Sequence, residues 1–114
     1  VGTINAAMLV TRKTIERSPE LVGELVLAHA RASRYLTAHR QEWLQAASEF
    51  GTPLEILELA ADNMELGWDM DEQFVRQARA LGERMQALGM ISKQPDYEQL
   101  FDLRFVQQAR ERLD

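Results

Sequence analysis

The sequence predicts a mainly helical fold, with one strand at residues 4–11 followed by about five helices. Three observations predict it. The length of 114 residues fits one domain, so the chain is expected to form a single segment, 1–114, without an internal domain boundary. Apolar residues recur at three- and four-residue spacings along most of the chain after Ser18. Proline, glycine and capping residues divide that part into separate helices.

The predicted strand is the short apolar run INAAMLVT, from Ile4 to Thr11. It has no helical period and is bounded by polar residues, which favours a buried strand over a helix. One strand needs a partner, so its open edge is expected to pair with another chain or another copy. A short helical turn is predicted after it, over Arg12 to Arg17.

The first long helix is predicted to begin at Ser18-Pro19-Glu20 and to run to about His39. Serine caps free amides, proline loses nothing at the first helical position, and glutamate suits the positive end of the helix dipole. Its apolar residues fall at helical spacing and are expected to form one core-facing stripe: Leu21, Val22, Leu25, Val26, Ala28, Ala32, Tyr35 and Leu36.

Two helices are expected in the middle of the chain. The first covers Arg40 to Phe50 and stops at Gly51, which suits the left-handed C-terminal position. The second covers Pro53 to about Asn63, introduced by a Thr-x-x-Glu capping box that begins at Thr52.

The C-terminal third is expected to hold a connector and two more helices. The connector, Met64 to Met70, lacks a period, and its Leu66 and Trp68 are expected to hold it against the body. A helix is predicted over 71–88. It is preceded by an Asp69-x-x-Glu72 capping box and followed by a glycine at residue 89, where it is expected to end. A loop and a turn at 97–101 precede a last helix over 103–113, capped by Asp102.

Charge is unevenly distributed. Thirteen basic and eighteen acidic residues leave a formal charge of −5, which disfavours nucleic acid as a partner. The stretch 41–75 carries nine acidic residues and no basic one. Such runs are usually solvated helix faces. The alternative is a free-standing helical protein-interaction domain that uses the acidic 41–75 face to hold a basic partner.

The residues carry no pattern of a catalytic or metal site. Cysteine is absent, and His29 and His39 are ten residues apart, about 80° out of line on one helix. No Gly-x-Ser-x-Gly elbow, glycine-rich phosphate loop or EF-hand pattern is present. The sequence therefore predicts no enzyme, no cofactor and no metal site.

The order of the signals resembles a known family. It comprises the apolar strand 4–11 that leads into V-T-R-K-T-I-E-R-S-P-E-L-V (Val10 to Val22), the long helix through A-H-A-R-A-S-R-Y-L (Ala28 to Leu36), the short helix after F-G-T-P (Phe50 to Pro53), the W-D-M-D connector (Trp68 to Asp71) and A-L-G-M-I-S-K-Q-P-D-Y-E-Q-L-F-D-L-R-F-V (Ala87 to Val106). This set is similar to the C-terminal third of periplasmic substrate-binding proteins for nitrate, taurine and aliphatic sulfonates, a family that also includes thiamine-precursor binders.

The resemblance implies a two-lobed α/β receptor of an ABC transporter. Such a receptor captures a small anionic or zwitterionic solute in the periplasm and delivers it to an inner-membrane permease. This chain would be its C-terminal portion, with the 4–11 strand joining a sheet of the first lobe and an incomplete ligand site of its own. On that basis Thr3 and Asn5 are the candidate residues for touching ligand or hinge.

Overall fold

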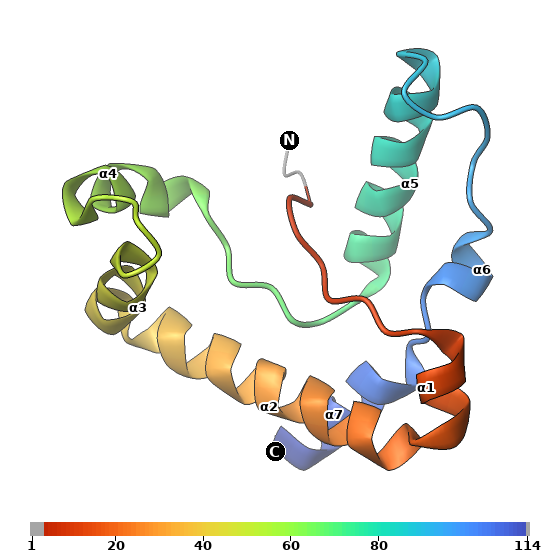
Figure 1. Cartoon of the computed structure of the whole chain (residues 1–114), viewed down its shortest axis with the longest axis horizontal. Coiled ribbons are helices and arrows are strands. Elements are labelled where there is room, and N and C mark those ends of the chain that lie inside the picture. Colours follow the sequence, from red (N-terminus) through yellow and green to blue (C-terminus); the bar gives the residue numbers. More distant parts are fainter. Residues whose placement is uncertain (1–3, 114) are drawn as a thin grey trace.

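The computed structural model describes residues 4–113, and within that range the chain is helical with no strand. Figure 1 shows an open frame in which α2 forms the base, α3 and α4 rise at one end and α5 stands at the other. The elements are α1 (Arg12–Arg17), α2 (Pro19–Ala38), α3 (Arg40–Ser48), α4 (Leu54–Ala60), the 3₁₀ turn η1 (Ala61–Asn63), α5 (Glu72–Ala87), α6 (Tyr97–Leu100) and α7 (Arg104–Leu113).

The prediction of a strand at 4–11 is wrong for this structure, whereas a mainly helical fragment, the rest of the predicted fold class, is compatible with it. Residues 4–11 form a segment without secondary structure, and Leu9 is 86% exposed. A β-strand exists only when a neighbouring backbone completes its ladder, and every regular element from residue 12 to 113 is helical. The segment ends at Thr11, whose side chain accepts a hydrogen bond from the Thr14 amide and caps α1.

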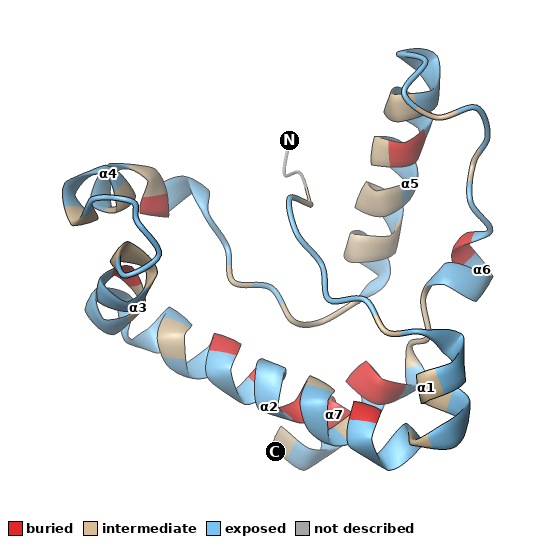
Figure 2. Cartoon of the chain, viewed as in Figure 1, coloured by how far each residue is buried: buried red, intermediate tan, exposed pale blue. Residues whose placement is uncertain are grey.

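The main packing contact joins α2 to α7, which lies across it. Leu27, Ala30 and Ala109 form the buried centre of this contact, with Trp68 and Leu113 packed against it. Small residues on both helices allow the two backbones to approach closely. Trp68 thereby holds the connector against the body, as the sequence predicts. Figure 2 shows buried positions of α2 beside buried positions of α7.

The core-facing side of α2 differs from the single stripe that the sequence predicts. The buried residues of α2 are Val22, Leu27, Ala30 and Ser33. Leu21 and Tyr35, which the predicted stripe includes, are 64% and 50% exposed. The helix is apolar on two opposite sides, and periodicity alone does not say which of them a neighbour covers.

The helices α3 and α4 pack against each other as a hairpin. Leu44 is fully buried in α3, and Gly51 turns the chain with a positive φ of 106°, as the sequence predicts. The capping box predicted at Thr52 is absent: α4 begins at Leu54 and its N-cap, Pro53, makes no side-chain cap bond. An ion pair between Arg40 and Asp62, 2.7 Å, ties α3 to the end of η1.

The far end of the chain folds back on α5. Gly89 ends this helix with a positive φ of 73°, as predicted, and α6 begins after Asp96 caps it. The Phe74 and Phe101 rings meet edge to face at 5.3 Å, which joins the start of α5 to the end of α6. Tyr97 is buried against Gly82, the one buried residue of α5.

The whole chain is open for its size. Its radius of gyration is 16.1 Å, compared with about 13 Å for a compact domain of about this length. The accessible surface is 8783 Å², whereas a folded monomer of this mass exposes about 6,400 Å². Large apolar residues lie on that surface: Met8, Leu9, Leu21, Leu25, Tyr35, Phe50, Ile56, Leu59, Met64, Leu88, Met90 and Leu100. Much of the apolar surface is thus left uncovered by the described part of the chain.

Candidate functional site

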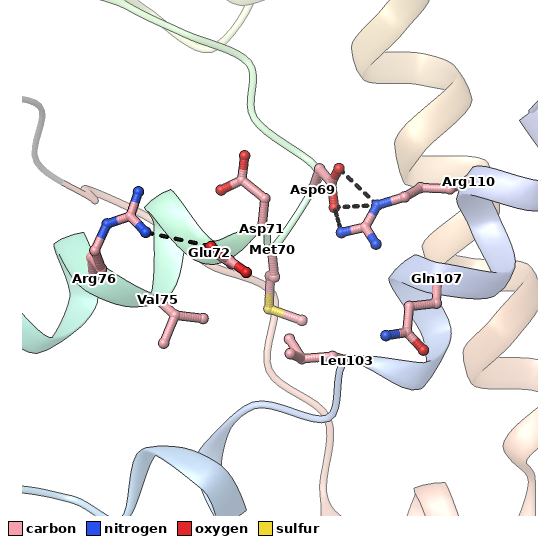
Figure 3. A pocket seen from close by; sticks show the side chains of 9 residues that line it. All are labelled: Asp69, Met70, Asp71, Glu72, Val75, Arg76, Leu103, Gln107 and Arg110. Atoms are coloured by element: carbon pink, nitrogen blue, oxygen red, sulfur yellow. Dashed lines mark hydrogen bonds and ion pairs between the residues drawn. The ribbon is translucent and has the colours of Figure 1, made fainter.

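A hollow lies where the connector, the start of α5 and the start of α7 meet (Figure 3). It is open to solvent and has a volume of about 810 Å³. Met70, Val75 and Leu103 supply apolar surface, and the remaining lining residues are polar or charged: Asp69, Asp71, Glu72, Arg76, Gln107 and Arg110. The hollow therefore combines a small apolar surface with charges of both signs.

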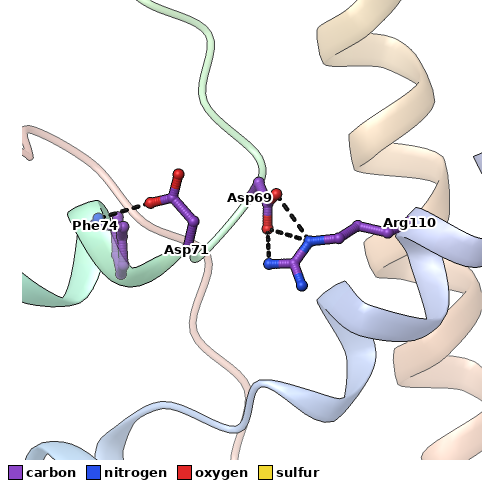
Figure 4. Close-up of polar contacts among 4 residues, drawn as sticks. All are labelled: Asp69, Asp71, Phe74 and Arg110. Atoms are coloured by element: carbon purple, nitrogen blue, oxygen red, sulfur yellow. Dashed lines mark hydrogen bonds and ion pairs between the residues drawn. The ribbon is translucent and has the colours of Figure 1, made fainter.

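The strongest polar contact at the hollow is the ion pair between Asp69 and Arg110 (Figure 4). Arg110 Nε donates to both carboxylate oxygens of Asp69, at 3.0 and 2.9 Å, and Nη2 donates to Oδ1. The hydrogen bond to Asp69 raises the pKa of Arg110 above its usual value. Since the two residues are 41 positions apart, this bidentate contact fixes the connector to α7.

The other two carboxylates serve α5. Asp71 accepts a hydrogen bond of 2.8 Å from the Phe74 amide and is the N-cap of the helix, so the cap lies two residues after the predicted Asp69. Glu72 faces Arg76 at 3.6 Å, and both side chains are well exposed. Each charged group that lines the hollow thus has a hydrogen-bond or ion-pair partner. The arrangement orients the connector and α5.

Asn5, one of the two candidate residues from the sequence, does not line this hollow. Thr3 lies outside the described residues, and Asn5 is an exposed residue of the N-terminal segment. Both histidines are exposed: His29 lies within α2, and His39 is the C-cap of the same helix and stacks on Tyr35 with ring centroids 4.0 Å apart. Among residues 4–113, no group of histidine and carboxylate side chains has the spacing of a metal site.

The acidic stretch 41–75 is divided among several places. Asp62, Asp69 and Glu72 form ion pairs with arginines that come from outside the stretch. Glu42 accepts a hydrogen bond of 2.8 Å from the Tyr35 hydroxyl, which raises the pKa of that tyrosine. Glu49, Glu55, Glu58 and Glu65 have no ion pair within the described part of the chain. Only this remainder, most of it on and around α4, is available to a basic partner.

Arg110 is the residue of this site that the sequence did not identify. It lies in a charged helix among other arginines, and nothing in its own spacing distinguishes it from a solvated residue. The W-D-M-D connector was the available signal. Trp68 was expected to pack against the helices, so the neighbouring Asp69 must also lie close to them. A carboxylate that is partly buried in this way is normally paired with a cation.

Comparison with known proteins adds no relative: no protein-family model, no curated protein and no solved structure matches this chain. None of the helices between residues 4 and 113 has the length and apolar character that crossing a membrane requires.

Proposed function

We propose that this chain is the helical C-terminal portion of an ABC-transporter substrate-binding protein. In this role the full receptor captures a small anionic or zwitterionic solute of the sulfonate, taurine or nitrate class. It then delivers the solute to an inner-membrane permease, so the proposed location is the periplasm. The portion described here does not supply a complete ligand site, and its task is to cover and brace the rest of the receptor.

The observation that carries the proposal is the collinear order of helix starts and stops. Ser18-Pro19 opens α2, Gly51 ends the α3 turn, Asp71 caps α5, and Gly89 closes α5 before the Asp96 cap. These are the points at which the chain resembles the receptor family. The N-terminal strand belonged to the same set and is absent, so the helical elements alone support the proposal.

The uncovered apolar surface supports the same proposal. The chain has an accessible surface of 8783 Å², and Phe50 and Leu59 are 93% and 79% exposed. Large apolar side chains are therefore in contact with water. Burying such groups is favourable by about 25 cal/mol per Å². A larger receptor body would supply the cover that this portion lacks.

Calorimetric titration of the full-length receptor that contains these residues tests the proposal. Taurine, an alkyl sulfonate and nitrate are the probes, and glucose is the uncharged control. We expect saturable binding of one of the three anionic or zwitterionic probes and a raised melting temperature in its presence. Absence of both effects with all three probes, in a protein that melts cooperatively, would refute the proposal.

A second candidate function rests on the surface of α3 and α4. Glu49, Glu55 and Glu58 have no ion pair in the described part of the chain, and the exposed Phe50 and Leu59 lie among them in the sequence. Acidic groups interspersed with apolar ones favour a basic amphipathic helix as partner. This is the alternative function that the sequence suggested, an interaction domain with an acidic face at 41–75. The proposed docking surface is now limited to the α3–α4 hairpin.

A lysine- and leucine-based amphipathic peptide is the probe for this second function. The triple variant Glu49→Gln, Glu55→Gln and Glu58→Gln is expected to weaken binding at least tenfold and to reduce its salt dependence. The control removes the same charge elsewhere, through Glu20→Gln, Glu83→Gln and Glu98→Gln, and should leave binding nearly unchanged. Equal binding by the two triple variants would dismiss the hairpin as an acidic docking surface.

A further inference from the structure

The C-terminal end of α5 carries two exposed apolar side chains in a turn of fixed shape. Leu88 is 70% exposed and Met90 is 66% exposed. The Met90 amide donates a hydrogen bond of 2.9 Å to a carbonyl of the last helical turn. Gln86, Gln94 and the buried Tyr97 form a chain of hydrogen bonds, 2.8 and 2.7 Å long, that fixes the loop after it. The turn therefore loses little conformational entropy when a partner binds it.

The charges nearest this turn in the sequence are two cations without an ion pair. Arg84 precedes Leu88 by one helical turn and lies about 40° from it around the helix. Lys93 follows in the loop, and both cations are exposed and form no ion pair within residues 4–113. Glu83 lies about 140° from Leu88 around α5, away from this side. We call the set of Arg84, Leu88, Met90 and Lys93 the α5 tip.

The exposed face of α4 has the opposite charge. Its four residues lie within an arc of about 160°, in the order Glu58, Glu55, Leu59 and Ile56, and we call them the α4 face. The carboxylates occupy one half of the arc, and the apolar side chains, 79% and 50% exposed, occupy the other. Neither carboxylate forms an ion pair within the described residues. Arg40 reaches the Glu58 carbonyl at 3.5 Å, but its charge is paired with Asp62.

We propose that the α5 tip of each chain binds the α4 face of a second copy, so that two copies form a dimer with two identical contacts. The proposal rests on the second candidate function, the acidic docking surface of the hairpin, and names its partner. Each surface combines exposed apolar groups with unpaired charges, and the two sets of charges have opposite signs. The cations of the tip then face the carboxylates of α4, while the apolar side chains of the two surfaces cover each other.

The shape of the chain suits two such contacts between copies. The helices α4 and α5 stand on the same side of α2, at its opposite ends, and α3 lies between α2 and α4 (Figure 1). The 20 residues of α2 span about 30 Å, which holds the two surfaces apart within one chain. A rotation of 180° about the line of sight of Figure 1 exchanges the two ends of α2 and sets each tip opposite the α4 face of the other copy. This arrangement is isologous and closes as a dimer.

The uncovered surface is large enough for this dimer. The chain exposes 8783 Å², about 2,400 Å² more than a folded monomer of its mass. A stable protein–protein interface of standard size buries about 800 Å² on each partner. The two contacts together can reach that size using surface that a compact chain of this length would already have buried.

Charge reversal followed by sedimentation equilibrium tests the pairing. The tip variant carries Arg84→Glu and Lys93→Glu, and the face variant carries Glu55→Arg and Glu58→Arg. Each variant alone should dimerise at least about tenfold more weakly than the parent chain, because like charges meet at both contacts. An equal mixture of the two variants should form a mixed dimer of parental affinity, because both contacts then join opposite charges. A variant that had merely lost its fold would not be restored by mixing.

The matched control makes the same charge change at another place. Arg12→Glu with Lys13→Glu reverses two exposed cations of α1 that form no ion pair within the described residues. This variant should dimerise as the parent chain does, since α1 belongs to neither surface. A loss of dimer equal to that of the tip variant would show that only net charge matters and would overturn the proposal.

Cysteine cross-linking tests which surfaces meet, because the chain contains no cysteine. A mixture of Leu59→Cys and Leu88→Cys chains should form a disulfide-linked mixed dimer under mild oxidation. Leu88→Cys alone should not cross-link, because the two tips lie at opposite ends of the dimer. A cross-link with Leu88→Cys alone, or no mixed dimer from the two charge variants, overturns the proposed pairing.

Peptide binding separates this proposal from the second candidate function on which it rests. The tip variant keeps the α4 face, so it should bind the lysine- and leucine-based peptide while remaining monomeric. If the parent chain is monomeric at all concentrations and the peptide binds, the second candidate function stands and the dimer is wrong. If the chain is monomeric and the peptide does not bind, both are wrong. None of these measurements involves a solute, so the transport proposal is tested separately.

Discussion

Replacing Gly82 with alanine should destabilise the protein, although glycine to alanine inside a helix normally stabilises it. A Cβ placed at Gly82 would overlap the Tyr97 hydroxyl and lie 2.7 Å from Gln94 Oε1. Tyr97 is only 8% exposed and donates a hydrogen bond of 2.7 Å to that same Gln94 oxygen. Since a tyrosine ring is rigid, the whole side chain must move to make room.

The expected loss follows from the contacts of Tyr97. Its hydrogen bond contributes about 0.5–1.5 kcal/mol, its stacking on Phe101 at 6.2 Å about 0.5–1.5, and the cation–π contact with Arg79 at 4.9 Å about 0.5–1. Alanine returns about 0.9 kcal/mol through its helix propensity. The net loss is about 2 kcal/mol, or about 8 °C in melting temperature for a chain of this length.

Thermal and urea unfolding followed by circular dichroism measure this loss. Gly23→Ala is the matched control, because Gly23 also lies inside a long helix. A Cβ there would meet Gln108 Oε1 at 3.6 Å and Phe105 Cδ1 at 3.9 Å, which are ordinary contacts. Gly23→Ala should therefore raise stability by about 0.8 kcal/mol. The same substitution thus has opposite signs in the two helices.

A rescue variant separates the steric cause from a general weakening of α5. Tyr97→Phe removes the oxygen that the new Cβ would overlap, so Gly82→Ala should cost less in the Tyr97→Phe background than in the parent. The reasoning is refuted if Gly82→Ala stabilises the protein as much as Gly23→Ala does. It is also refuted if the loss is the same in both backgrounds, because the hydroxyl would then play no part.

Three further predictions concern stability. Leu44→Ala, at a fully buried position, should lower the free energy of unfolding by about 3 kcal/mol in urea titrations, while Leu59→Ala at 79% exposure should change it by less than about 0.5. Asp71→Ala removes the cap of α5 and should cost about 1 kcal/mol, seen as faster amide exchange in its first turn. The hydrogen bond from Arg104 lowers the pKa of Asp102 below its ordinary value of 3.8. The ionised Asp102 therefore stabilises the fold above pH 3.8, and this stabilisation is lost as the pH falls through the lowered pKa. In a plot of melting temperature against pH, Asp102→Asn should flatten the acidic part of the curve.

The sequence predicted the helices and their ends well, because those features depend on local interactions. Pro19 begins α2, and Gly51 and Gly89 adopt the positive φ that a tight turn requires. Predictions that named a particular side-chain bond were less accurate. Thr52 does not cap α4, and Asp71 rather than Asp69 caps α5. Several polar residues lie near each helix start, and the backbone geometry of the turn decides which of them makes the capping hydrogen bond.

In the candidate site, too, some features could be predicted from local sequence and others could not. The connector and the anchoring role of Trp68 followed from the absence of a period and the presence of a large apolar residue. The pairing of Asp69 with Arg110 did not follow, because it joins residues 41 positions apart through the docking of α7 on α2. Thr3 and Asn5 were candidate residues only through the resemblance, and their role stays a prediction.

By itself the sequence determined where the chain is helical, where it turns, and that it carries no familiar catalytic motif. Those properties depend on propensity, capping and spacing within a few residues. Only the tertiary structure decided that residues 4–11 have no strand partner, and that α7 covers the Ala30 side of α2 and leaves the Leu25 side open. Both outcomes depend on which distant segment is present to pair or pack, and neither a strand nor an amphipathic helix encodes its own neighbour.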